Sequence, residues 1–241
     1  MATTFDAVWA RPVARDRGFF FAMALATAGT TIAGFVLAIA MRHSSFGAPW
    51  WVHVHGVTMM GWLALYVIQN ALVWRGQVSA HRSLGMVGAA WSVWVVAVGA
   101  TTNTWSAMTH RVPPFFETNT FLAMDYLTVA TFAGLVWAGI ALRGRSDWHR
   151  RLMLCAAIQV MTPGIGRLVP LPLIAPGWQI GVILACLVPF MLAALLYDLT
   201  TRGRIHPAYG WGFGAIIGAA ALMRPLAFTP PMLALTKAIA G

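Results

Sequence analysis

Residues 50–74 read WWVHVHGVTMMGWLALYVIQNALVW, a stretch that contains no Asp, Glu, Lys or Arg. A helix that crosses a lipid bilayer needs about 20 consecutive, mostly apolar residues. This stretch is longer than that, and it begins with two tryptophans, a residue type that favours the membrane interface. It therefore predicts a membrane-spanning helix.

The rest of the chain has the same character. Of its 241 residues, 59% are hydrophobic and 9% are charged, whereas a soluble domain is about 45–50% apolar and about 25% charged. This composition excludes a soluble enzyme, a disordered chain and a disulfide scaffold. We predict an all-α transmembrane bundle over residues 18–228, preceded by a segment at 1–17 and followed by a tail at 229–241. Its seven predicted spans are 18–41, 50–74, 83–105, 119–142, 152–173, 177–199 and 208–228.

The arginines predict the orientation of this bundle. The net charge is +10, and the connections on the N-terminal side of the membrane hold most of the positive residues. Because cytoplasmic loops are enriched in Lys and Arg, the N-terminus and segment 1–17 are expected in the cytoplasm and the C-terminal tail outside. The expected location is a bacterial inner membrane, with the lipid bilayer as the first partner. No basic run is interleaved with aromatics, so a nucleic-acid partner is not expected.

Two connections share a pattern that suggests internal duplication. Arg75-Gly76 is followed six residues after the arginine by His81, and Arg143-Gly144 is followed at the same spacing by His149. The chain then consists of one helix plus three hairpins that point the same way, as in some transporter folds. Chance similarity between two short basic turns is the alternative.

Small and sulfur-containing residues give two further predictions. Gly210, Gly214 and Gly218 recur every four residues, a spacing that lets helix backbones approach closely, so they are expected to form a packing face. Cys155 and Cys186 lie in different spans and are expected to be free, buried thiols.

Four ionisable residues are predicted at one depth in the outer half of the membrane. His55, Asp125, Arg167 and Arg224 each lie about 24–30 Å along a helix from its cytoplasmic end, at 1.5 Å per residue. Charges inside a bilayer usually face the bundle interior or a cavity. One interpretation is a polar ligand-binding pocket in which Asp125 pairs with one arginine and the other arginine takes an anionic group. The alternatives are side chains that reach up to water, or a structural Asp–Arg tie.

The histidines suggest a second kind of site. His81 and His149 each begin a helix at the cytoplasmic side, and His55 lies near the opposite side. Two of the cytoplasmic histidines, such as His81 and His149, are possible ligands of a haem iron between helices, and His55 is a further candidate. Contact with lipid phosphates is the alternative for His81 and His149. No spacing in the sequence brings together the three or four ligands that zinc or copper requires, so no other metal site is predicted.

Several of these residues carry a resemblance to known proteins. The chain resembles a widespread family of bacterial polytopic membrane proteins of uncharacterised activity that have His-Arg-x-Leu turns. The matching motifs are His55 to Trp62, Gln69, His81-Arg82-x-Leu84, Asp125, His149-Arg150-Arg151-Leu152, Gly166-Arg167, Asp198 and Gly203-Arg204-x-His206-Pro207. A looser similarity is to the four-helix membrane cytochromes b, which hold haem between histidines of neighbouring helices. That second resemblance implies haem b as a cofactor.

Three functions follow from these patterns. The first is a membrane protein whose outer polar pocket binds a redox cofactor or an anionic amphiphile, a quinone or haem b, with a possible role in electron transfer. The second is a non-catalytic subunit of a larger respiratory or photosynthetic complex, which would have other membrane subunits as partners. The third is a small-solute transporter. The sequence alone does not decide whether the protein is an enzyme.

Overall fold

The computed structural model describes residues 15–44, 46–175 and 177–241, and in these ranges the chain is helical with no strand. Residues 1–14 of the predicted N-terminal segment lie outside the described residues. The helices are α2 (Asp16–Ala40), α3 (Trp50–Trp74), α4 (Val78–Met108), α5 (Thr118–Ala141), α6 (Ser146–Val160), α7 (Thr162–Leu168), the short 3₁₀ helix η1 (Leu171–Leu173), α8 (Gln179–Arg202), α9 (Pro207–Ala227) and α10 (Pro230–Ala240).

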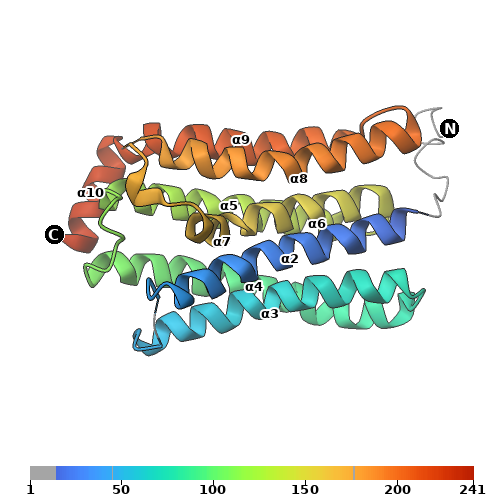
Figure 1. The fold of residues 1–241 in the computed structure, drawn as a ribbon, viewed down its shortest axis with the longest axis horizontal. Coiled ribbons are helices and arrows are strands. Elements are labelled where there is room, and N and C mark those ends of the chain that lie inside the picture. Colours follow the sequence, from blue (N-terminus) through green and yellow to red (C-terminus); the bar gives the residue numbers. More distant parts are fainter. Residues whose placement is uncertain (1–14, 45, 176) are drawn as a thin grey trace.

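The long helices lie side by side along the longest axis of the molecule (Figure 1). Six of the described helices are long and apolar enough to cross a membrane, namely α2, α3, α4, α5, α8 and α9. This confirms the all-α, multi-pass character. The predicted count of seven spans is not confirmed, and the orientation stays a prediction.

The predicted helix over 152–173 is not one continuous helix. α6 ends at Val160, α7 runs only from Thr162 to Leu168, and η1 follows. The physical reason is local, because Pro163 lacks a backbone N–H and Gly164 and Gly166 weaken a helix. Gly164 also fits a close contact, since a Cβ placed on it would lie 2.7 Å from Cα of Thr31 on α2. The break therefore lets the backbone of α7 pack directly against α2.

The two ends of the bundle differ in charge. The start of α2 and the α3–α4, α5–α6 and α8–α9 connections lie at one end (Figure 1), which we call the arginine-rich end because its connections carry Arg75, Arg143, Arg145 and Arg204. The other end we call the α10 end. The predicted tail at 229–241 forms α10 there, and this helix packs against α4, α5 and α9.

The core is built around α6, which packs against α2, α5, α8 and α9. Residues 154–158 are fully buried. Cys155 is one of them, and it lies against Gly212 of α9, where a Cβ would overlap the sulfur. Gly210, Gly214 and Gly218, which were expected to form a packing face, do not pack against another described helix of this chain, because nothing lies within 4 Å of a Cβ placed on any of them. Both cysteines are free, as predicted, although Cys186 is only partly buried.

Candidate functional site

Three transmembrane helices approach one another at Gly99 of α4. A Cβ placed on Gly99 would lie 3.2 Å from Cγ2 of Val129 on α5 and 3.5 Å from Cε of Met59 on α3. Residues four positions apart on a helix share a face. One helical turn closer to the α10 end, the same faces of these helices therefore carry three polar residues. They are His55 on α3, Asn103 on α4 and Asp125 on α5.

Two of these polar groups are buried without a hydrogen-bond partner. Nδ1 of His55 and Oδ2 of Asp125 are both inaccessible, and neither has a partner among the described residues. Leaving such a group unsatisfied costs about 1–3 kcal/mol, and buried polar atoms in native proteins nearly always have a partner, which can be protein, water or ion. The polar lining continues farther toward the α10 end, where the hydroxyls of Thr104 and Tyr126 are 2.7 Å apart.

The two arginines of the predicted pocket lie at exposed positions. The guanidinium of Arg167 stands 4.1 Å from the ring centre of Phe35 and donates a hydrogen bond to the carbonyl of Pro163 at 2.8 Å. Arg224, in the last turn of α9, lies over the ring of Phe228 at 5.7 Å.

The predicted pairing of Asp125 with an arginine is therefore wrong, since no ion pair of Asp125 occurs in the described part of the chain. The reason is the break between α6 and α7, because the new short helix turns Arg167 toward α2 rather than toward α5. Arg167 contacts Phe35 of α2 instead, and Asp125 forms no ion pair with either arginine among the described residues.

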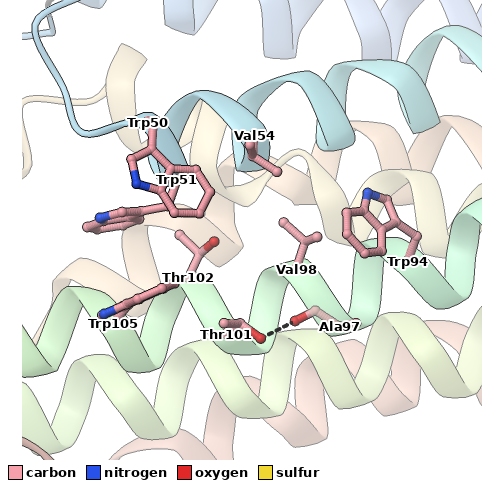
Figure 2. A pocket seen from close by; sticks show the side chains of 9 residues that line it. All are labelled: Trp50, Trp51, Val54, Trp94, Ala97, Val98, Thr101, Thr102 and Trp105. Carbon is pink, nitrogen blue, oxygen red and sulfur yellow. Dashed lines mark hydrogen bonds between the residues drawn. The ribbon is translucent and has the colours of Figure 1, made fainter.

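An apolar groove runs along the seam between α3 and α4 (Figure 2). Its volume is about 170 Å³. Trp51 stacks on Trp105 with ring centres 6.2 Å apart, and Figure 2 shows Trp50 with them at one end of the groove and Trp94 at the other. The lining residues are Trp50, Trp51, Val54, Trp94, Ala97, Val98, Thr101, Thr102 and Trp105. Because Trp51 precedes His55 by one helical turn, the wall of this tryptophan groove adjoins the polar cluster.

Hydrogen bonds from tryptophans hold the seam together just below the groove. Nε1 of Trp94 donates to Oγ1 of Thr58 at 3.0 Å, and Nε1 of Trp91 donates to the carbonyl of Thr58 at 3.0 Å. A buried indole N–H needs such an acceptor. Thr58 therefore fixes the rings of Trp91 and Trp94 on α4 against α3.

A different network fills the arginine-rich end, and the sequence analysis did not find it. Arg151 and Asp198 are both fully buried and form a two-point ion pair, with 2.8 Å between Nε and Oδ2. Oδ2 also accepts from the backbone N–H of His206 at 3.2 Å. This arrangement ties α6 to α8 and to the start of α9. A signal was present, because Asp198 is an acid near the end of an otherwise apolar span.

His206 extends this network in a defined protonation state. Its Nδ1 accepts from the backbone N–H of Ala208 at 3.1 Å, so Nε2 carries the proton and donates to the carboxylate of Asp147 at 3.0 Å. Burial lowers the pKa of His206 to about 4, although the hydrogen bond to Asp147 acts in the opposite direction. The ring is therefore neutral at pH 7, and it serves as the N-cap of α9.

Asp16 completes the arginine-rich end. It accepts from Arg150 at 2.8 Å and from Arg202 at 2.6 Å. Its other oxygen accepts from the hydroxyl of Tyr197 at 2.9 Å. The acids of this end thus have protein partners, as a structural tie requires. The Oδ2 atom of Asp125 has none among the described residues.

The structure separates the three possible haem ligands. His55 lies toward the α10 end, whereas His81 of α4 and His149 of α6 meet at the arginine-rich end with ring centres 6.2 Å apart. Among the three candidate haem ligands, His81 and His149 are therefore the pair whose rings face each other across neighbouring helices. His55 has no histidine partner of this kind among the described residues.

Comparison with family models, with curated proteins and with solved structures finds no match. The resemblance to the family with His-Arg-x-Leu turns therefore stays a prediction that rests on the motifs quoted above.

Proposed function

We propose that the protein is a membrane protein that binds a quinone between α3, α4 and α5, through His55 and Asp125. The observation that carries the proposal is the pair of buried, unpartnered atoms, Nδ1 of His55 and Oδ2 of Asp125. They lie on facing helices, one turn beyond the contact at Gly99. A ligand that supplies both missing hydrogen bonds removes the cost of burying them.

The chemistry of a quinone head group matches these two atoms. A quinone carbonyl accepts a hydrogen bond from an imidazole N–H, and a quinol hydroxyl donates one to a carboxylate. When a bound quinol is oxidised, two electrons leave to a redox partner and two protons leave the hydroxyls. His55 and Asp125 are then the proton acceptors within reach, a use that intramembrane His and Asp residues commonly have.

The tryptophan groove supports the amphiphilic character of the proposed ligand. Its walls are aromatic and aliphatic, and it adjoins the polar cluster at Trp51. An isoprenoid tail placed there leaves the head group beside His55. Ligand sites commonly combine an apolar lining with a few polar groups that fix orientation.

The arginines favour a second amphiphile as the competing ligand. Arg167 lies at an exposed position, where an anionic lipid can bind it at the surface of the bundle. A neutral quinone depends on Asp125 and is insensitive to the charge of Arg167, whereas an anionic amphiphile depends on Arg167. The two ligands therefore predict opposite mutational patterns.

The test is a titration of the purified protein with short-chain ubiquinone and menaquinone analogues, followed by quenching of tryptophan fluorescence. We expect Asp125→Asn and His55→Phe each to weaken quinone binding about tenfold or more, the effect of losing one hydrogen bond to a charged or strongly polar group. Glu117→Gln is the matched control, because Glu117 is an exposed acid at the start of the same helix. Equal affinity in all variants contradicts the proposal. Loss only in Arg167→Gln also contradicts it, because that pattern is the one expected of an anionic amphiphile.

A subunit role is the second candidate, favoured by one observation. Gly210, Gly214 and Gly218 form a stripe on α9 with open space beside each, and the neighbouring Trp211 is exposed. Small residues of this spacing suit contact with another transmembrane helix. Gly214→Leu is expected to abolish co-purification of a partner chain in mild detergent while leaving the thermal stability of the isolated chain unchanged. An unchanged set of co-purifying chains contradicts this role.

A further inference from the structure

Two exposed arginines from different helices lie at one corner of the arginine-rich end, where α2 begins beside the end of α3. The two helices pack against each other. A terminal guanidinium nitrogen of Arg17, in the first turn of α2, lies 3.7 Å from the position that a Cβ on Gly76 would take. Gly76 follows directly after Arg75, and Arg17 and Arg75 are both exposed. We call this place, with its neighbours Phe21 and Trp74, the α2–α3 corner.

The positive charge of this corner is not balanced within the described part of the chain. The described acids at this end already have partners in the protein. They form the pairs Asp16 with Arg150 and Arg202, Asp147 with His206, and Asp198 with Arg151. Neither Arg17 nor Arg75 forms an ion pair among the described residues. Both guanidiniums are therefore available to an anion from outside the chain.

An aromatic pair lies next to the two arginines, farther into the bundle. Phe21 lies one turn along α2 from Arg17. Its ring stacks on that of Trp74, the last residue of α3, with ring centres 5.1 Å apart and an interplanar angle of 18°. Trp74 is 50% exposed, so the stack is open to the surroundings of the bundle. Because tryptophan favours the level of the lipid head groups, this pair marks the level at which head groups meet hydrocarbon.

An apolar strip continues from the corner along α2. Residues four apart share a helix face, so Phe21, Leu25 and Gly29 follow Arg17 on one side of the helix. Leu25 is 48% exposed, and nothing lies within 4 Å of a Cβ placed on Gly29. From Arg17 to Gly29 the helix rises about 18 Å, and one leaflet of a bilayer has about 15 Å of hydrocarbon. The strip is therefore open and as long as one leaflet is thick.

This order of groups matches the order of groups in a phospholipid. A phospholipid has an anionic phosphate at one end, then glycerol, then acyl chains. Guanidinium groups pair well with phosphate oxygens, often through two parallel hydrogen bonds. A lipid with a net negative head group gains more here than a zwitterionic lipid, because the guanidiniums repel the ammonium group of the zwitterion.

We propose that the α2–α3 corner is a binding site for an anionic phospholipid. Arg17 and Arg75 hold the phosphate, and one acyl chain lies along Phe21 and Leu25. The site differs from a diffuse attraction of lipid to the whole arginine-rich end, because it fixes one lipid at one place. It does not rest on the proposed quinone site, since it uses other residues at the other end of the bundle.

The experiment uses the full chain, purified in mild detergent and freed of bound lipid. It is titrated with dioleoyl phosphatidylglycerol or dioleoyl phosphatidylcholine, and bound lipids are counted by native mass spectrometry. We expect a first phosphatidylglycerol that binds more tightly than later ones and than any phosphatidylcholine. Arg17→Gln/Arg75→Gln should weaken this first binding about 25-fold, from about fivefold for each arginine.

The matched control is Arg143→Gln/Arg204→Gln. It removes the same charge from exposed positions of the same end, in the α5–α6 and α8–α9 connections, and should leave the first phosphatidylglycerol bound with wild-type affinity. Inorganic phosphate at the same concentration as the lipid should not displace it, because phosphate lacks the acyl chains.

Three results overturn the proposal. They are equal binding of the two lipids by the wild type, equal weakening in the two double variants, and displacement of phosphatidylglycerol by inorganic phosphate. The comparison of the two lipids on the wild type decides the question even where a variant fails to fold. Asp125→Asn should keep the first phosphatidylglycerol, so a failure of the quinone site and a failure of this site are distinguishable.

Discussion

The same substitution, Asp to Asn, should have opposite effects at Asp198 and Asp125. Asp198 is fully buried and paired with the fully buried Arg151. Asp198→Asn leaves that guanidinium buried without its counter-charge, and breaking a buried pair from one side costs about 3–5 kcal/mol. A chain of this length shifts its Tm by about 2–4 °C per kcal/mol. We therefore expect Asp198→Asn to lower Tm by about 6–20 °C.

Asp125→Asn should leave Tm unchanged or raise it slightly. The carboxylate has no ion pair among the described residues, and its Oδ2 atom is buried without a hydrogen bond. Replacing it by a neutral amide of the same shape removes the cost of desolvating a charge and breaks no protein contact that the structure shows. The loss should instead appear in quinone affinity, as described above.

The assay is thermal unfolding in detergent with a thiol-reactive fluorophore, in a Cys186→Ala background that removes the partly buried second thiol. Cys155 is fully buried and reacts only when the core opens. Glu117→Gln serves as the neutral control at an exposed acid. The reasoning is refuted if Asp198→Asn unfolds at the wild-type temperature, or if Asp125→Asn loses as much stability as Asp198→Asn.

Three further predictions concern pH, packing and orientation. Burial lowers the pKa of His206 to about 4, so below about pH 6.5 the folded chain binds fewer protons than the unfolded chain. Tm should therefore fall as the pH drops from about 6.5 toward 4. His206→Asn keeps an N-cap residue at this position and should make Tm less dependent on pH. Gly212→Ala should destabilise the protein by about 1–3 kcal/mol, because the new Cβ overlaps the sulfur of Cys155. Gly214→Ala places its Cβ in open space and should be neutral or stabilising in the same thermal assay. Equal Tm values for the two variants would contradict the packing described. In intact cells a membrane-impermeant maleimide should label Thr109→Cys, at the α10 end, and leave Ser79→Cys, at the arginine-rich end, unlabelled; the reverse pattern would invert the orientation.

Much of the fold could be predicted because bilayer length and hydropathy constrain it directly. The stretch at 50–74 appears as α3 with the predicted bounds, and residues 119–142 differ from α5 by a single residue at each end. The failure at 152–173 has a physical cause. Overall apolar length did not reveal that Pro163 and two glycines end one helix and start another, although those residues were visible in the sequence.

The site was harder to predict because depth along a helix says nothing about the direction of a side chain. Four residues at one depth suggested one pocket, yet Arg167 and Arg224 lie at exposed positions, while His55 and Asp125 follow helix faces that turn toward one another. Pairing across helices was also invisible, so the ion pair between Arg151 and Asp198, 47 positions apart in the chain, could not be read from spacing. The meeting of His81 and His149 required the packing of α4 and α6 on α5.

Photolabelling with an azido-quinone tests the central claim most directly, because it maps where the head group lies rather than whether a variant binds. Purified protein is irradiated with the probe, digested and analysed by mass spectrometry, with excess unmodified quinone as competitor. The account predicts competed labelling in peptides from α3, α4 and α5 around His55, Thr102 and Asp125. Labelling confined to other helices, or labelling that excess quinone does not reduce, would contradict it.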